Sequence, residues 1–199
     1  MATITNQAAL SYNGVTTLSN IAVGELVEVL TATKTAADTT YTAGGIKTFV
    51  ISLVNSSAAA LTGLTVTDTL GSYTFSGNTL YPLTYVTGSL LYYVNGALQA
   101  TPTVTATAPL TVTGVTVPAG GSAMLIYTAR VNEYAPLGVE DSITNTATIT
   151  GGGLTSSVTA TETINASPAP QLAISKSISP TMVAENGTLT YTLTLQNRG

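Results

Sequence analysis

Hydrophobic and polar residues alternate at every second position along most of this chain, in runs rich in Thr, Val, Ile, Leu and Tyr. This period of two predicts half-buried β-strands, because successive side chains of a strand point to opposite faces. Turns that contain glycine separate the runs, and a helical period is almost absent. The clearest runs are 47–55, 61–70, 90–96, 110–117, 122–131, 142–150 and 189–197.

Many short strands joined by tight turns predict an all-β protein with the fold of an immunoglobulin-like antiparallel β-sandwich. The segment NEYAPLG at 132–138 interrupts the alternation. We expect this segment to be a crossover loop, with one short helical turn as the alternative.

An internal repeat indicates where each structural repeat begins and ends along the sequence. The segment ITNQAALSYNG at 4–14 resembles ITNTATITGGG at 143–153, and residues 30–57 resemble residues 172–199. The chain therefore begins with a segment that resembles the closing part of its own repeat.

These boundaries divide the chain into one complete structural repeat and two partial repeats. We predict one complete sandwich repeat over 27–163, preceded at 1–26 by the terminal strand or strands of another repeat. Residues 164–170 (INASPAP) are expected to form a proline-containing linker. Residues 171–199 are then the first two strands of a following, truncated repeat.

Two explanations account for the partial units, and the sequence leaves both open. The sequence is a fragment of a longer tandem array, or its ends are complementary and join subunits head to tail. In the second case the strand at 4–10 is a donor strand that completes the C-terminal unit of the next subunit. An exposed strand edge is a ready template for such pairing.

Composition narrows the functional classes. Charged residues make up 7% of the chain, against about 25% in an average soluble domain. The net charge of −4 provides no basic surface for nucleic acid, and no apolar run is long enough for a membrane helix. The first residues lack the basic and apolar regions of a signal peptide.

The absence of two residue types restricts the chemistry further. The chain contains no Cys and no His, which removes disulfides, thiolate metal sites and the commonest general base. We therefore expect no metal, no cofactor and no enzyme that acts on a diffusible substrate.

Three polar side chains occupy strand positions that should face the core. The alternation places Lys34, Asp68 and Asn145 each among apolar residues on one face of its strand. Buried without partners, each group would cost several kcal/mol. The sequence allows a buried Lys34–Asp68 ion pair with Asn145 hydrogen-bonded alongside, or an isopeptide bond between Lys34 and Asn145. The third alternative is that one of the three faces solvent.

In the isopeptide hypothesis, the neutral amine of Lys34 attacks the side-chain carbonyl carbon of Asn145 and ammonia departs. Asp68 is the catalytic residue, which hydrogen-bonds and polarises that carbonyl and shuttles protons. Burial disfavours the charged forms of amines and carboxylic acids alike, so a neutral amine and a protonated acid can coexist in a core. The product is a single-turnover crosslink between the first and last strands of the unit. Isopeptide-bonded pilin and adhesin domains provide the analogy.

The repeat extends this hypothesis to contacts between subunits. Lys176 corresponds to Lys34, and Asn6 corresponds to Asn145. If the strand at 4–10 completes the next subunit, Lys176 and Asn6 from different copies meet and form an intermolecular crosslink. Residues 171–199 contain no counterpart of Asp68, so this hypothesis predicts that sequence following Gly199 contains a strand similar to TDTL.

The order of these elements resembles a known family. A lysine-bearing strand, a glycine turn, TFVISLVNSS followed by LTGLTVTDTLG, and a closing ITNTATITG are similar to the bacterial surface repeat called domain of unknown function eleven. The resemblance implies an immunoglobulin-like repeat of cell-wall proteins, adhesins and spore-surface appendages. The sequence departs from wall-anchored members of this family because it shows neither a secretion signal nor a sortase-type tail, which favours assembly inside a spore's mother cell or a truncated sequence.

These observations together predict a structural subunit of a bacterial surface or spore-appendage fibre. Its partner would be other copies of itself, and its location the bacterial cell surface or the spore surface. The alternative is an adhesin or stalk repeat that spaces or presents a ligand-binding site without polymerising.

Overall fold

The computed structural model describes residues 2–26, 28–167 and 172–197, and every regular element within these ranges is a β-strand. The predicted all-β, immunoglobulin-like sandwich is confirmed. Residues 132–138 form a loop without strand or helix. The described ranges contain no helix that is long and apolar enough to cross a bilayer.

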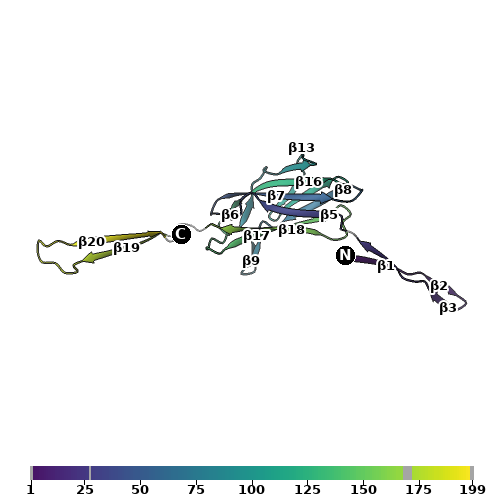
Figure 1. Ribbon diagram of the computed structural model, residues 1–199, viewed down its shortest axis with the longest axis horizontal. Coiled ribbons are helices and arrows are strands. Elements are labelled where there is room, and N and C mark those ends of the chain that lie inside the picture. Colours follow the sequence, from purple (N-terminus) through teal and green to yellow (C-terminus); the bar gives the residue numbers. More distant parts are fainter. Residues whose placement is uncertain (1, 27, 168–171, 198–199) are drawn as a thin grey trace.

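Two antiparallel sheets form the sandwich (Figure 1). The first sheet has β16 near its centre and β5 at one edge. In order, its strands are β13 (Ala97–Gln99), β12 (Leu91–Val94), β16 (Ser122–Val131), β7 (Ile46–Asn55) and β5 (Leu30–Ala36). A further short strand, β11 (Leu83–Tyr85), also pairs with β16. The second sheet ends in a short parallel pairing of β18 with β6, and its strands are β14 (Thr103–Thr107), β15 (Leu110–Val117), β8 (Leu61–Asp68), β17 (Ser142–Gly151), β18 (Val158–Ala166) and β6 (Thr40–Tyr41).

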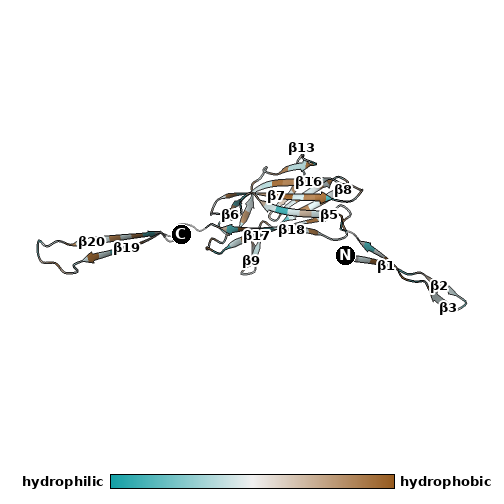
Figure 2. Ribbon diagram, in the orientation of Figure 1, coloured by the Kyte–Doolittle hydropathy of each residue, from teal (hydrophilic) through white to brown (hydrophobic). Residues whose placement is uncertain are grey.

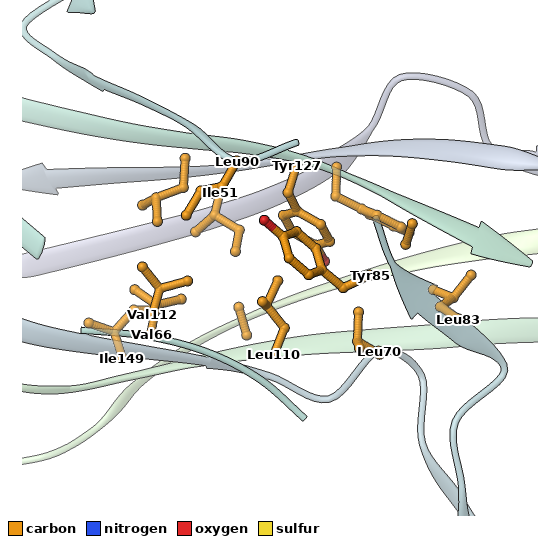
Figure 3. Packing of buried hydrophobic residues seen from close by; sticks show 14 of the residues in the cluster. Ile51, Val66, Leu70, Leu83, Tyr85, Leu90, Leu110, Val112, Tyr127 and Ile149 are labelled. Atoms are coloured by element: carbon orange, nitrogen blue, oxygen red, sulfur yellow. The ribbon is translucent and has the colours of Figure 1, made fainter. Parts of the chain in front are cut away.

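The core lies between these two sheets. Every second residue of β7 and β16 is buried, as the alternation predicts. Figure 3 shows Ile51 and Tyr127 of the first sheet facing Val66 and Leu110 of the second. Burial of such side chains contributes about 25 cal/mol per Å² of apolar surface and is the main term that holds the two sheets together.

The end of the sandwich differs from the sequence prediction. Residues 164–166 were expected in the linker, but they form the end of β18, and Ile164 and Ala166 are buried in the core. The reason is the ladder with β17, in which Ser142 pairs with Asn165, so β18 continues as far as its partner. The rest of the expected linker, from 168, lies outside the described residues. Asn145 is therefore on the next-to-last strand of the sandwich.

Two hairpins flank the sandwich (Figure 1). In the N-terminal hairpin, β1 (Ala2–Asn6) pairs with β4 (Ala22–Leu26), and β2 (Ala9–Tyr12) pairs with β3 (Val15–Leu18). The predicted donor strand at 4–10 is thus already paired along one edge, within its own hairpin. In the C-terminal hairpin, β19 (Leu172–Ser179) pairs with β20 (Thr190–Asn197). A third, small hairpin joins β9 (Tyr73–Phe75) to β10 (Asn78–Leu80).

The flanking hairpins expose apolar side chains that the sandwich strands would bury. Figure 2 shows hydrophobic residues on β7 and β16 of the sandwich and also on β19 and β20. Ile174 and Leu195 of the C-terminal hairpin are 69% and 73% exposed. Two-stranded hairpins are marginal in water, so these apolar faces gain stability when another sheet covers them.

Candidate functional site

Lys34 extends from the edge strand β5 into the core. Only 4% of the residue is exposed. Its Nζ lies 5.2 Å from the centre of the Phe49 ring and 6.0 Å from the centre of the Tyr127 ring. These two rings stack on each other with centroids 5.5 Å apart. An ammonium near aromatic faces is stabilised by the ring quadrupoles, which offsets part of its lost hydration.

Asp68, the last residue of β8, forms an ion pair with Lys34. Lys34 Nζ donates a hydrogen bond of 2.5 Å to Asp68 Oδ2, and both side chains are almost completely buried. The backbone N–H of Leu70 donates to Oδ1 at 3.0 Å, and the Tyr127 hydroxyl donates to Oδ2 at 2.7 Å. A buried carboxylate with three donors is well satisfied, which a buried ion pair requires.

Tyr127 of β16 connects the acid to the carboxamide. Its hydroxyl donates to Asp68 and accepts a hydrogen bond of 3.0 Å from Asn145 Nδ2. The core therefore contains one continuous hydrogen-bonded network, with residues from both sheets. It runs from Lys34 through Asp68 and Tyr127 to Asn145.

The carbonyl oxygen of Asn145 has two donors of its own. The backbone N–H of Gly71 and the hydroxyl of Thr69 each donate to Oδ1 at 3.2 Å. The sequence-based hypothesis assigned this hydrogen bond to Asp68, and in this respect it was wrong. The turn that follows β8 carries Thr69 and Gly71 to the carbonyl, while Asp68 contacts Asn145 only through Tyr127.

Burial shifts the pKa of two groups in this hydrogen-bonded network. Desolvation lowers the pKa of Lys34 from 10.5 to about 8, although the Asp68 carboxylate opposes the shift. Desolvation, followed by the nearby Asp68 charge, raises the pKa of Tyr127 well above its ordinary value. The site therefore combines an amine that has a neutral fraction near physiological pH with a hydroxyl that keeps its proton.

The other two predicted residues are placed differently. Lys176 of β19 and Asn6 of β1 lie on the two flanking hairpins, and both are exposed. Lys176 Nζ lies 4.4 Å from the centre of the Tyr191 ring on the neighbouring strand. Within one chain the structure brings Lys34, Asp68 and Asn145 into one network and leaves Lys176 and Asn6 on separate hairpins.

Sequence reasoning missed Tyr127, Thr69 and Gly71. Tyr127 occupies an inward position of β16, so the alternation indicated its burial but not its partners. Thr69 and Gly71 directly follow the catalytic candidate in the segment DTLG at 68–71, and this adjacency was the available signal. In the parts of the chain that the structure describes, no three acidic side chains gather where they could hold a metal ion.

The two-sheet fold and its buried lysine–acid–tyrosine–asparagine network define an immunoglobulin-like sandwich domain with a polar network in its core. The solved structure of BcpA, the major pilin subunit of Bacillus cereus, is similar, with a TM-score of 0.50 and 13% identity over 98% of this chain. The RrgB pilus backbone of Streptococcus pneumoniae has a TM-score of 0.47 and 13% identity over 61% of this chain. The N-terminal domain of the Streptococcus gordonii adhesin Sgo0707 has a TM-score of 0.48 and 14% identity over 76%.

The similarity to BcpA establishes the fold. The matches span 63% of BcpA, 31% of RrgB and 35% of the adhesin chain, so this chain corresponds to less than two thirds of each. No family model and no curated protein matches the sequence. Membership of the domain-of-unknown-function-eleven family therefore stays a prediction.

Proposed function

We propose that this chain is a structural subunit of a bacterial surface or spore-appendage fibre, and that an isopeptide bond between Lys34 and Asn145 locks its sandwich. The hydrogen-bonded chain that runs from Lys34 through Asp68 and Tyr127 to Asn145 carries the proposal. Apolar residues in these positions would avoid the desolvation cost. The presence of polar residues here, in a protein with 7% charged residues, therefore favours a chemical role. The pilin fold of BcpA supports the fibre assignment.

The reaction converts a lysine ammonium and a carboxamide into a secondary amide and ammonia. Asp68 accepts one proton from Lys34, and the neutral amine attacks Cγ of Asn145. A new bond forms between Lys34 Nζ and Cγ, and the bond from Cγ to Nδ2 breaks. Nζ loses a second proton, Nδ2 leaves as ammonia after gaining one proton, and Asp68 retains the other or passes it on to form ammonium.

The position of the bond suits a load-bearing subunit. Lys34 is on β5 at the edge of the first sheet, and Asn145 is on β17 in the second sheet. A bond between them joins the sheets covalently across the core. Force applied along the chain would then meet a covalent bond instead of hydrogen bonds and apolar contacts.

Intact-mass measurement of the purified chain tests the crosslink. We expect the wild type to be lighter than its calculated mass by one ammonia, and the Lys34→Ala variant to have its full calculated mass. Asp68→Asn is the matched control for the acid, because its amide cannot accept the lysine proton, and it should also keep full mass. A wild-type chain of full calculated mass would refute the intramolecular bond.

The C-terminal hairpin has the same strand register as the start of the sandwich. Lys34 pairs with Ile51 in the β5–β7 ladder, and Lys176 pairs with Leu193 in the β19–β20 ladder. In the sandwich, the second sheet covers Lys34 and Ile51. In the hairpin, Leu193 is 58% exposed, so an equivalent covering sheet is absent among the described residues.

We propose that another copy of the chain supplies strands to cover this face. Its N-terminal hairpin would take the place that β17 and β18 have in the sandwich, with Asn6 in the position of Asn145. Lys176 and Asn6 would then meet between subunits and form the second crosslink, with an acid from outside 171–199 taking the part of Asp68. The repeat of ITN at 4–6 and 143–145 supports this assignment.

Boiling in detergent followed by electrophoresis tests this assembly. We expect a ladder of covalent oligomers from the full chain, and its loss in Lys176→Ala and in Asn6→Ala. Lys34→Ala should keep the ladder, because it removes only the internal bond. Monomer alone at all concentrations of the wild type would contradict the head-to-tail proposal and leave the internal crosslink unaffected.

A second candidate function is a stalk or adhesin repeat that does not polymerise. The register shared by β5–β7 and β19–β20 favours it equally, because successive repeats of a tandem array have the same strand pairing. Sedimentation equilibrium would then show a monomer over the whole concentration range, and glycan or host-protein arrays would show a ligand bound by that monomer.

A further inference from the structure

We infer that Thr69 and Gly71 form an oxyanion hole for the attack of Lys34 on Asn145, and that Tyr127 transfers a proton from Asp68 to the departing nitrogen. The inference rests on the crosslink proposed above and assigns three residues that the sequence-based hypothesis did not include. The directions of two hydrogen bonds assign Thr69 and Gly71, and the position of Tyr127 between Asp68 and Asn145 assigns the proton transfer.

The orientation of the Asn145 carboxamide comes from the backbone of Gly71. The N–H of Gly71 can only donate, so the atom 3.2 Å away must be the carbonyl oxygen of Asn145 and not its amide nitrogen. The oxygen that becomes negative during the attack therefore already faces a donor. Preorganised donors at such an oxygen are commonly the largest single contribution to catalysis of acyl transfer.

Thr69 supplies the second donor in a defined direction. Its Oγ1 accepts a hydrogen bond of 3.0 Å from the backbone N–H of Thr146. The hydroxyl proton is then available for Asn145 Oδ1, which lies 3.2 Å from Oγ1. Two donors from consecutive parts of one turn thus converge on the carbonyl oxygen of Asn145, whose residue is fully buried.

The turn that presents these donors has an unusual backbone. Leu70 has a φ of 52° and Gly71 a φ of 72°, both in the left-handed region. For a non-glycine residue such as Leu70 this conformation costs about 1 kcal/mol. Strain of this kind persists at functional sites when the geometry it produces is needed. Here the turn directs the N–H of Leu70 at Asp68 and that of Gly71 at Asn145.

Tyr127 is placed to carry a proton between the acid and the leaving group. Its hydroxyl lies 2.7 Å from Asp68 Oδ2 and 3.0 Å from Asn145 Nδ2. Once Asp68 has taken a proton from Lys34, both hydrogen bonds of the Tyr127 hydroxyl must reverse: the new Asp68 O–H donates to the Tyr127 oxygen, and the Tyr127 O–H turns toward Nδ2. The Asp68 proton then passes to the Tyr127 oxygen while the tyrosine proton moves to Nδ2. Tyr127 ends unchanged, Asp68 is again a carboxylate that can accept the second lysine proton, and ammonia leaves.

Timed cell-free synthesis of the full chain tests both roles. Aliquots are quenched in denaturant, and intact mass gives the crosslinked fraction at each time. We expect Thr69→Val to slow crosslinking about 100-fold, the range seen when one oxyanion donor is lost. Thr69→Ser keeps the hydroxyl and should restore a rate close to the wild type, which a purely steric role for Thr69 would not predict. Tyr127→Phe should slow crosslinking by at least tenfold.

Each substitution is also made in a Lys34→Ala background, where no crosslink can form. The melting temperatures of these chains show whether a slow variant is folded, and Thr69→Ala replaces Thr69→Val if the latter does not fold. A wild-type rate in folded Thr69→Val would overturn the oxyanion hole, and a wild-type rate in Tyr127→Phe would overturn the proton transfer. A wild type that never loses ammonia would instead refute the crosslink itself.

Discussion

Lys34 is surrounded by groups that act on its charge in opposite directions. The core removes water from the amine, while Asp68 and the rings of Phe49 and Tyr127 favour its ammonium form. Desolvation is the larger influence, which lowers the pKa to about 8. The same burial that reduces the stability of the ammonium makes the amine available as a nucleophile near neutral pH.

This lowered pKa predicts a pH-dependent stability when the crosslink is absent. In Asn145→Ala the amine remains, and between pH 8 and 9.5 the unfolded chain binds more protons than the folded chain. Because the folded pKa is about 8 and the unfolded value about 10.5, stability should increase with pH in this window, by about 1.5 kcal/mol. Urea unfolding at a series of pH values measures it.

The wild type is the control for this prediction. Its Lys34 nitrogen would be part of an amide, which does not titrate, so its stability should stay level over the same window. Equal pH dependence in both chains would show that Lys34 keeps a free amine in the wild type. A level profile in Asn145→Ala would show that burial does not depress the pKa of the folded amine.

The turn at 68–71 is the element that assembles the site. In four residues it supplies the carboxylate of Asp68, the hydroxyl of Thr69 and two inward N–H groups. A Cβ added at Gly71 would lie 2.3 Å from Ile143 Cγ2, a distance that atoms do not tolerate. Glycine is therefore required here both for its φ and for the close approach of β17.

Gly71→Ala should reduce stability more than a glycine substitution that meets no neighbour. Gly77 is the matched control, because its φ is 79° and no atom lies within 4 Å of an added Cβ. Gly77→Ala should cost about 1 kcal/mol from the left-handed backbone alone. Gly71→Ala should cost about 1–3 kcal/mol more, because Ile143 or the turn must move.

Both substitutions are measured by urea unfolding in a Lys34→Ala background, so that the covalent state is the same. Equal losses at the two sites would mean that the turn relaxes away from Ile143 without cost. In the chain that keeps Lys34, Gly71→Ala should also slow ammonia loss, because the displaced N–H no longer reaches Asn145.

The chain combines a sandwich that buries Lys34, Asp68 and Asn145 with two hairpins that expose apolar faces. The hairpins repeat elements of the sandwich, and β19–β20 has the strand register of β5–β7. In the proposed function, a crosslink from β5 to β17 would strengthen the sandwich, and the hairpins would be the surfaces through which one copy joins another. Both properties suit a fibre, in which each subunit transmits tension to the next.

Single-molecule stretching from the two ends tests the mechanical role of the crosslink. The bond would enclose about 110 residues between Lys34 and Asn145, equivalent to roughly 360–400 Å of extended chain. We expect Lys34→Ala to release this length when the sandwich unfolds, and the wild type not to release it. Equal contour lengths for the two chains would contradict a covalent lock.

Much of this arrangement was predictable from the sequence. The runs at 110–117 and 122–131 coincide with β15 and β16, and the inward placement of Lys34, Asp68 and Asn145 followed from the period of two. Ile164 was placed in a linker because proline and small residues follow it closely. Only the pairing of β18 with β17 and β6 shows that the strand continues to Ala166.

The sequence by itself determined which side chains face inward, because alternation along a strand is a local property of the backbone. It also indicated the repeat, since matching segments need no coordinates. The place of Tyr127 between Asp68 and Asn145 depended on how two sheets from distant parts of the chain stack. The donors at Asn145 depended on the left-handed turn at Leu70 and Gly71. These are relations across the core, and no period along the chain encodes them.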